Sequence, residues 1–357
     1  MKNILSLTKK ELERELLSNN IKTFRASQIW NQIYVRGCKS FLDMTDLSLG
    51  DRESLSRIYN IERPKVNSDH TSSDGTRKWL VEFEDKNLVE TVFIPEDDRA
   101  TLCISSQIGC TLSCKFCHTG TQTLVRNLDV EEIIQQIMVA KDLIKDWSKN
   151  KENNNRILSN IVFMGMGEPF YNYDNVKKAI EILLNQDGLA FSARRITIST
   201  SGLVPEIIKA SKDLKTSLAI SLHSANDEVR TKIMAINKKY PLKDLMHACK
   251  IYNQDNKNIK ITFEYIMLKD VNDSNDQAYE LINLIKKNNI NAKINLIPFN
   301  PWMSCGYFRS DDKRIIEFQK LLKKNSLIAT IRKTRGDDVM AACGQLKSQS
   351  LRKKNTR

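Results

Sequence analysis

Three cysteines stand at a spacing that is typical of iron–sulfur ligation. Cys110, Cys114 and Cys117 form the pattern C-x3-C-x2-C inside the segment 103–128. Three thiolates on one loop can bind three irons of a [4Fe–4S] cube and leave the fourth iron open to a substrate. A closed zinc site is the alternative, but it needs a fourth nearby ligand, and His118 follows Cys117 too closely for comfortable chelation. The spacing therefore favours a cluster with one open iron.

The composition is that of an ordinary globular protein with a basic surplus. Charged residues make up 28% of the 357 residues and apolar residues 41%, and the formal net charge is +13. The surplus suits a polyanion such as RNA, although a surface charged only for solubility would give the same count. The segment 350–357, SLRKKNTR, is expected to be a basic tail that touches phosphates.

The sequence favours a cytoplasmic protein that does not contact a membrane. No apolar run approaches the ~18 residues of a membrane span, and the first residues lack the order of a signal peptide. Cytosolic cysteines are normally kept reduced, which favours metal binding or catalysis over a disulfide framework. The length suggests two domains, or one large α/β barrel with an appendage.

Two kinds of segment precede the cysteine loop. Apolar residues at three- and four-residue spacing predict helices between about residues 5 and 61, with a capping box at Thr8 and Glu11 and turns at Gly37 and Gly50. Residues 76–95 alternate apolar and polar side chains around a turn, as a β-hairpin does. Alternation alone predicts that Glu90, inside the second strand of that hairpin, faces solvent.

The segments after the cysteine loop alternate between strand-like and helical patterns. A helix is expected from Asp129 through Trp147, followed by a polar surface linker over residues 149–156. Six strand-like runs then alternate with helical segments, which predicts a parallel sheet with right-handed crossovers. The runs are IVFMGM, RRITIST, TSLAISLH, KITFEYIML, AKINLIPF and LIATIRK. Ligands of such a sheet bind at the carboxyl ends of its strands.

Polar and glycine residues follow several of these strands. The motif GMGEP places Gly165 and Gly167 where backbone approaches a ligand closely, and Glu168 suits an ammonium donor. Other residues at strand ends, each of which taken alone could be an ordinary turn residue, are Ser199, Ser221, Leu222, His223 and Asn300.

With these motifs in order, the sequence resembles the RlmN family of radical S-adenosylmethionine (SAM) RNA methyltransferases. The resemblance rests on CISSQIGC, the cysteine triplet, RNL, GMGEP, SLHSAND and AACGQL. It implies an α/β fold, a partial (βα)6 radical SAM barrel with a small N-terminal helical accessory domain that engages RNA. It also implies a [4Fe–4S] cluster on the three cysteines and SAM bound by the strand-end residues. The implied divisions are 1–62 for the helical domain, 63–98 for a β-hairpin linker, 99–336 for the barrel and 337–357 for a C-terminal segment.

The same resemblance implies roles for residues that the spacing leaves undecided. Cys343, in AACGQL, matches a cysteine that is methylated by a first SAM and loses hydrogen to a radical made from a second. Its methylene radical adds to carbon 2 of adenine, Glu90 accepts the proton, and Cys103 releases the product by forming a disulfide with Cys343. Cys38, Cys249 and Cys305 receive no role.

The implied substrates are an adenine of 23S rRNA in the peptidyl-transferase region and an adenine beside the tRNA anticodon. A cytosolic electron donor and a thiol reductant are the implied partners, and a monomer is expected. Two alternatives remain: the related enzyme that methylates carbon 8 of the same rRNA adenine, and a metal-containing RNA-binding protein without catalysis. Zinc without iron in the isolated protein would favour the second.

Overall fold

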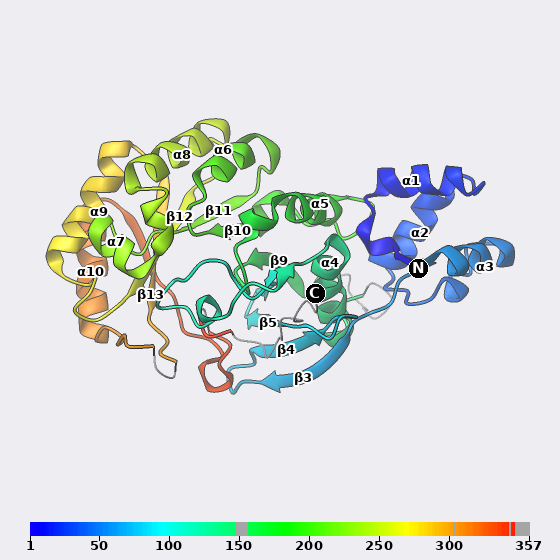
Figure 1. The fold of residues 1–357 in the computed structure, drawn as a ribbon, viewed down its shortest axis with the longest axis horizontal. Coiled ribbons are helices and arrows are strands. Elements are labelled where there is room, and N and C mark those ends of the chain that lie inside the picture. The colour runs from blue at the N-terminus through cyan, green and yellow to red at the C-terminus, as the bar shows by residue number, and fades with distance from the viewer. Residues whose placement is uncertain (148–155, 303–304, 343, 347–357) are drawn as a thin grey trace, which may run out of the picture.

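A ten-stranded mixed sheet is the centre of the fold in the computed structural model (Figure 1). The structure describes residues 1–147, 156–302, 305–342 and 344–346. Cys343, the basic tail and all but one residue of the expected linker lie outside the described residues. The strands run in the order β14-β13-β12-β11-β10-β9-β6-β5-β4-β3. Their bounds are β3 Lys65–Thr71, β4 Arg77–Glu82, β5 Leu88–Glu96, β6 Arg99–Cys103, β9 Leu158–Phe163, β10 Ile196–Thr200, β11 Ser217–Ser221, β12 Ile261–Met267, β13 Ala292–Pro298 and β14 Ile328–Ile331.

Six βα units make up the parallel part of the sheet, which confirms the predicted radical SAM barrel class. β6, β9, β10, β11, β12, β13 and β14 pair in parallel with their neighbours in turn. The sequence counted six strands after the cysteine loop, whereas the first parallel strand, β6, precedes that loop. The units therefore begin at β6, and β14 closes the series without a helix of its own. The helices are α4 Val130–Leu143, α5 Tyr173–Leu184, α6 Val204–Asp213, α7 Asp227–Ile233, α8 Leu242–Asp255, α9 Asn275–Asn288 and α10 Asp312–Lys324.

The helix after the cysteine loop ends earlier than expected, at Leu143 instead of Trp147. Lys145 has a φ of +55°, a conformation that ends a helix rather than extending it. The next residue, Asp146, is buried and accepts hydrogen bonds from the backbone N–H groups of Ile157 (2.8 Å) and Leu158 (3.2 Å). The chain turns here because these contacts bind the end of α4 to the start of β9.

The predicted hairpin is present and is continuous with the barrel sheet. β4 and β5 pair antiparallel, β3 adds to β4, and β5 pairs with β6. Its strands therefore bring residues of β4 and β5 directly beside the strand that leads into the cysteine loop. No helix in the described parts of the chain is both long and apolar enough to cross a lipid bilayer.

Three N-terminal helices pack at one end of the molecule, near α4 and α5 (Figure 1). They are α1 Lys9–Ser18, α2 Arg25–Tyr34 and α3 Leu49–Ile58, and the short strands β1 Lys2–Asn3 and β2 Tyr59–Asn60, which flank them in the chain, pair in parallel. The capping box of Thr8 and Glu11 is confirmed. Gly37 has a φ of +72° in a turn, but Gly50 lies inside the first turn of α3, so its predicted turn is wrong.

Candidate functional site

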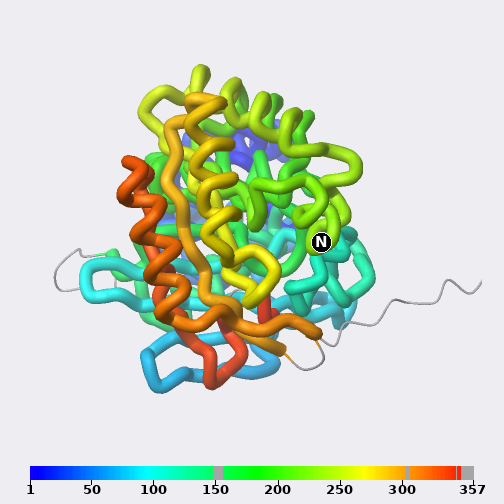
Figure 2. Tube along the Cα trace, turned by 90° about the vertical axis from the view of Figure 1, so that its left-hand side faces the viewer, coloured from blue at the N-terminus to red at the C-terminus, as the bar shows by residue number. Residues whose placement is uncertain are grey.

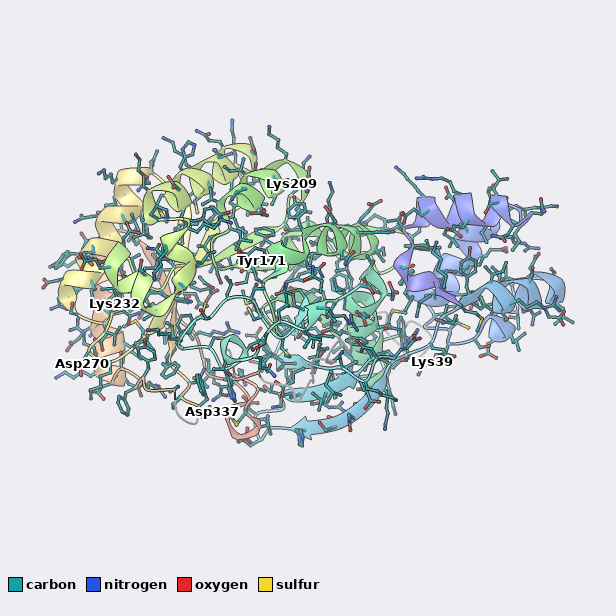
Figure 3. The ribbon with its side chains drawn as sticks, in the orientation of Figure 1. Lys39, Tyr171, Lys209, Lys232, Asp270 and Asp337 are labelled. Atoms are coloured by element: carbon teal, nitrogen blue, oxygen red, sulfur yellow. The ribbon has the colours of Figure 1, made fainter. Side chains whose placement is uncertain are left out.

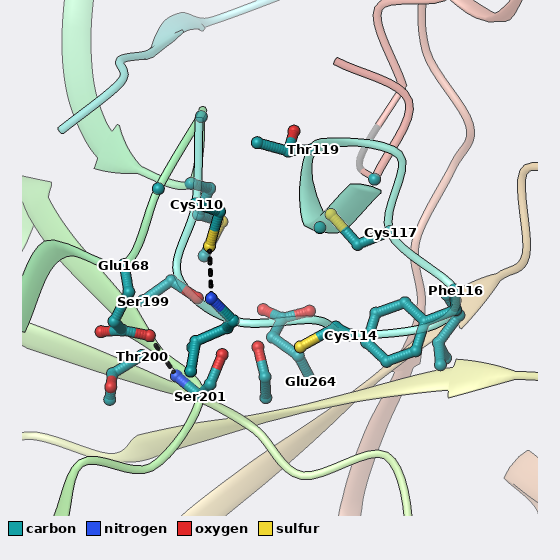
Figure 4. A pocket seen from close by; sticks show the side chains of 18 of the residues that line it. Cys110, Cys114, Phe116, Cys117, Thr119, Glu168, Ser199, Thr200, Ser201 and Glu264 are labelled. Carbon is teal, nitrogen blue, oxygen red and sulfur yellow. Dashed lines mark hydrogen bonds between the residues drawn. The ribbon is translucent and has the colours of Figure 1, made fainter. Parts of the chain in front are cut away.

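A cavity at the carboxyl ends of the parallel strands brings most of the candidate residues together (Figure 4). It lies between the cysteine loop and the ends of β9, β10, β11 and β12. The predicted residues that line it are Cys110, Cys114, Cys117, Gly165, Gly167, Glu168, Ser199, Ser221 and His223. The sequence prediction that ligands bind at this edge therefore agrees with the shape of the molecule.

The cysteine loop presents three thiols to this cavity. Cys110 Sγ accepts a hydrogen bond from the backbone N–H of Leu112 (3.3 Å), and the backbone N–H of Cys117 donates to the carbonyl of Cys114 (3.1 Å). Burial raises the pKa of the Cys110 thiol to about 12 and raises that of Cys114 as well. Among the described residues, no three His, Cys, Asp or Glu side chains converge as ligands of a single ion. A cube is bound through a different iron by each thiolate, so three separated thiols facing one space fit that group.

Ser105 and Gln107 fix the strand-to-loop connection beside the cavity. Ser105 Oγ donates to the carbonyl of Glu90 (2.8 Å) and accepts from the backbone N–H of Met166 (2.9 Å). Gln107 Oε1 accepts from the backbone N–H of Glu168 (2.8 Å). The buried polar residues of CISSQIGC thus join β5, the cysteine loop and the GMGEP motif, because each buried polar atom requires a partner.

The two glycines of GMGEP are required by the protein's own chain. A Cβ atom on Gly165 would lie 2.7 Å from the carbonyl oxygen of Ile104, and one on Gly167 would lie 2.4 Å from Cβ of Gln107. The φ of Gly167 is +95°, which side chains disfavour. The close approach that the structure shows is to the segment 104–107 of the protein itself. Both glycines also line the cavity, so the predicted approach to a ligand stays a prediction.

Replacing Gly167 by alanine is expected to destabilise the fold. The positive φ costs about 1–3 kcal/mol for a residue with a side chain, and the clash with Gln107 adds to that cost. Thermal unfolding of Gly167→Ala should show a lowered midpoint. Gly50→Ala is the matched control, because nothing lies within 4 Å of a Cβ there and the residue is helical. A midpoint for Gly167→Ala equal to that of the control would contradict the steric account.

Glu168 is a buried carboxylate that joins two strand ends. Its Oε1 accepts from the backbone N–H of Phe170 (3.1 Å) and its Oε2 from that of Ser201 (2.8 Å), the second bond being drawn in Figure 4. Burial raises the pKa of Glu168 to about 7, and the hydrogen bonds oppose this shift. An ammonium group in the cavity would favour the ionised form, so the site fits the cationic amino group expected there.

The other predicted strand-end residues divide into two groups. Ser199, Ser221 and His223 line the cavity, whereas Leu222 and Asn300 are buried beside it without lining it. Burial, followed by the charge of Arg230, lowers the pKa of His223 to about 3. Burial therefore favours the neutral imidazole of His223 at physiological pH. Its Nδ1 accepts a hydrogen bond from the backbone N–H of Ile266 (3.1 Å).

Glu90 does not face solvent, so the prediction from alternation is wrong. Its side chain is buried, and its Oε1 lies 2.9 Å from Nζ of Lys78 on the neighbouring strand. β5 lies between β4 and β6 inside the sheet, and both of its faces are covered over this stretch. A two-residue alternation indicates an exposed face only where a sheet has one.

The C-terminal segment packs on the cysteine loop. The backbone N–H of His118 donates to the carbonyl of Gly344 (2.7 Å), and Thr119 Oγ1 donates to the carbonyl of Leu346 (2.6 Å). Gly344 and Leu346 line the cavity together with the three cysteines. Cys343 itself is outside the described residues, but its following neighbour, Gly344, borders the cavity. Cys103 is buried at the carboxyl end of β6, just before the cysteine loop begins.

Two charged residues of the cavity were missed by the sequence analysis. Glu264 on β12 is buried, and burial raises its pKa; Asn295 Nδ2 donates to its Oε2 (2.7 Å). Arg332, which directly follows β14, also lines the cavity. A glutamate inside the apolar run ITFEYIM was a usable signal for Glu264, because charged residues are rarely buried without a partner. For Arg332 the corresponding signal was a charged residue near the end of the predicted strand run LIATIRK.

Comparisons with known proteins agree with this arrangement. Residues 104–282 match the model of the radical SAM superfamily, and residues 2–61 match that of the ribosomal RNA large subunit methyltransferase N-terminal domain. The dual-specificity RNA methyltransferase RlmN of Rhodospirillum rubrum is 50% identical, over 99% of this chain and 82% of its own length. The protein of the same name from Dinoroseobacter shibae is 47% identical, over 100% of this chain and 92% of its own.

A solved structure supports the same relationship. The crystal structure of a radical SAM methyltransferase from Sphaerobacter thermophilus matches with a TM-score of 0.90 and 36% identity, covering 97% of this chain and 99% of that one. The similarity therefore extends over the helical N-terminus, the barrel and the segment that packs on the cysteine loop. The chain belongs to the RlmN family of RNA methyltransferases within the radical SAM superfamily.

Proposed function

We propose that this protein methylates carbon 2 of adenine in 23S rRNA and in tRNA, in the cytoplasm and as a monomer. The names of its relatives support an RNA methyltransferase of dual specificity. The observation that carries the proposal is the cavity where the three-cysteine loop and the strand ends meet Gly344 and Leu346, which follow Cys343 in the chain. Carbon 2 lies between two ring nitrogens and is a poor nucleophile, so a polar methyl transfer from SAM would fail there.

The cavity residues divide into those that would hold each cofactor. Cys110, Cys114 and Cys117 would bind the cluster, and Glu168 would bind the ammonium group of SAM. A bound cluster and SAM would supply a 5′-deoxyadenosyl radical, with the electron coming from a cytosolic donor. Further SAM contacts are proposed for Gly167, Ser199, Ser221, Leu222, His223 and Asn300.

The proposed reaction assigns three tasks to the chain's own residues. Cys343 carries the methyl group and forms the carbon–sulfur bridge to adenine. Glu90, buried beside Lys78, accepts the proton that leaves carbon 2. Cys103 then attacks the sulfur of Cys343, and the resulting disulfide is reduced by a thiol partner. The position of Cys103 at the end of β6, next to the cysteine loop, supports this last task.

Mass mapping of reacted RNA tests the proposal. Protein loaded with iron anaerobically should convert the target adenine in both a 23S rRNA fragment and a tRNA to 2-methyladenine, in the presence of SAM and a reductant. Chromatography of the nucleosides separates carbon 2 from carbon 8. An adenine methylated only at carbon 8 would favour the related enzyme, and iron-loaded protein that methylates neither RNA would defeat the proposal.

RNA binding should depend strongly on salt. The net charge of +13 implies several phosphate contacts, so the affinity is expected to fall steeply between low and physiological salt. Deleting residues 350–357 should reduce the salt slope without changing which adenine is modified, because phosphate contacts position the RNA without reading its sequence. Filter binding across a salt series measures the slope. An affinity that does not change with salt would exclude phosphate contacts as its main source.

A further inference from the structure

The turn between β3 and β4 is hydrogen-bonded to residues 336–338, in the segment that leads to Cys343. Ser72 Oγ donates to Asp338 Oδ1 (2.5 Å), and the backbone N–H of Ser73 donates to Asp338 Oδ2 (3.0 Å). Asp74 Oδ2 accepts from the backbone N–H of Gly336 (3.1 Å). Figure 2 shows this C-terminal segment, in red, beside the strands β3 and β4, in blue. Residues more than 250 apart in sequence are thus joined by several hydrogen bonds.

A second attachment holds the far side of the same segment. Gln345 Nε2 donates to Asp337 Oδ1 (3.2 Å) and to the carbonyl of Pro301 (3.3 Å), while Gln345 Oε1 accepts from the backbone N–H of Ala342 (3.2 Å). Asp337 is labelled in Figure 3, next to the ends of β3 and β4. Residues on both sides of Cys343 are therefore joined to other parts of the protein, Gly336 and Asp338 to the turn between β3 and β4 and Gln345 to Pro301.

Lys78 on β4 connects this segment to the proposed proton acceptor. Its Nζ lies 2.9 Å from Glu90 Oε1 and donates a hydrogen bond to the carbonyl of Met340 (3.2 Å). The side chains of Lys78 and Glu90 are only 13% and 7% exposed. A buried carboxylate without a cation tends to take up a proton, and a protonated Glu90 could not accept one from adenine. The ammonium group of Lys78 therefore pairs with the carboxylate of Glu90 and is also hydrogen-bonded to Met340, in the segment that leads to Cys343.

We infer that Lys78 is a positioning residue for methyl transfer, which holds Glu90 ionised and at a fixed distance from the segment that carries Cys343. The inference rests on the proposed function. Glu90 takes the proton from carbon 2 after the methylene radical has added there, and the electron pair of the broken carbon–hydrogen bond stays with the purine ring. The one unpaired electron of the adduct would return to the cluster bound by Cys110, Cys114 and Cys117, while Lys78 forms and breaks no covalent bond. Nothing in this role requires Lys78 to touch RNA or SAM.

The test replaces Lys78 and measures the methylation rate with ordinary RNA and with RNA deuterated at carbon 2 of the target adenine. Lys78→Met is expected to lose roughly 10²-fold in kcat, because a misplaced catalytic group costs about that much. Proton removal should also become the slow step. The deuterium isotope effect on kcat is therefore expected to exceed that of the wild-type protein. A merely structural role would lower the rate without changing the isotope effect.

Two other variants complete the design. Lys86→Met is the matched control, since Lys86 lies in the turn between β4 and β5, is 81% exposed at its side chain and pairs with Oε1 of Glu82 (3.1 Å). Its rate and isotope effect should equal those of the wild type. Lys78→Arg keeps the cation with a different geometry, so it should give an intermediate rate and an intermediate isotope effect. If Lys78→Met fails to fold, the rate and the isotope effect of Lys78→Arg test the inference on their own.

The outcomes distinguish this inference from the proposed function. A wild-type protein that methylates RNA, together with Lys78 variants whose isotope effect stays at the wild-type value, would overturn the inference alone. An iron-loaded wild-type protein that forms no methyladenine would overturn the proposed function. A raised isotope effect in Lys78→Met, with iron content equal to that of the wild type, is the result we expect.

Discussion

Cys103→Ala is expected to trap the protein covalently joined to its RNA. If Cys103 only releases the product, its loss still permits methylation of Cys343, hydrogen removal and addition to adenine. The carbon–sulfur bridge then has no thiol to break it. A protein band shifted by bound RNA should accumulate, disappear on nuclease treatment and resist thiol reductants, because a thioether is not a disulfide. Released methylated RNA should fall to the level of a single incomplete turnover.

Cys38→Ala provides a closely matched control for this experiment. Cys38 and Cys103 are both cysteines of 9% exposure, but Cys38 lies in the N-terminal helical region. The control should release methylated RNA at the wild-type rate and show no shifted band. Methylated RNA released at the same rate by Cys103→Ala would remove the resolving role, and Cys103 would then be a packed thiol at the end of β6.

Removing any one of the three loop cysteines should abolish both iron loading and 5′-deoxyadenosine formation. Each of Cys110→Ala, Cys114→Ala and Cys117→Ala deletes one thiolate of the proposed cluster, and the cavity offers no further described cysteine to replace it. Iron analysis and the absorption of the reconstituted protein measure the first loss, and chromatography of the nucleoside measures the second. Full SAM cleavage by all three variants would contradict the assignment.

The control for the cluster variants is Cys249→Ala. Cys249 is fully buried in α8 and does not line the cavity. Its removal should leave the iron content unchanged. The comparison separates the loss of a ligand from the loss of any buried thiol, since a Cys→Ala change in a core removes little volume.

Local signals in the sequence were reliable where they depend on near neighbours in the chain. The capping box of Thr8 and Glu11, the hairpin around residues 83–87 and the order of βα units follow from spacing over a few residues. The sequence predicted that Gly165 and Gly167 approach a ligand closely, and the close approach that the structure shows is to the protein's own chain. The group that approaches, the segment 104–107, could not be known, because that contact depends on the pairing of β6 with β9.

Long-range contacts account for what the sequence could not provide. Glu90 looked exposed because alternation suggests one exposed face, whereas both faces of β5 are covered in the folded protein. The pairing of Glu90 with Lys78 depends on strands that meet only in the folded sheet. The same is true of the hydrogen bonds that Lys78 and Asp74 make with residues 336–340. Spacing in the chain contains no information about such pairs. The roles of Glu90, Cys103 and Cys343 came instead from the resemblance to the RlmN family, and they stay predictions.

The fate of a labelled methyl group tests the central claim most directly. With SAM that carries three deuterium atoms on its methyl group, the route through Cys343 removes one deuterium and transfers the remaining two on the methylene carbon. We predict 2-methyladenine with two deuterium atoms and one hydrogen in the new methyl group, and one deuterium in 5′-deoxyadenosine. A methyl group that reaches adenine with all three deuterium atoms would show direct polar transfer and would contradict this account.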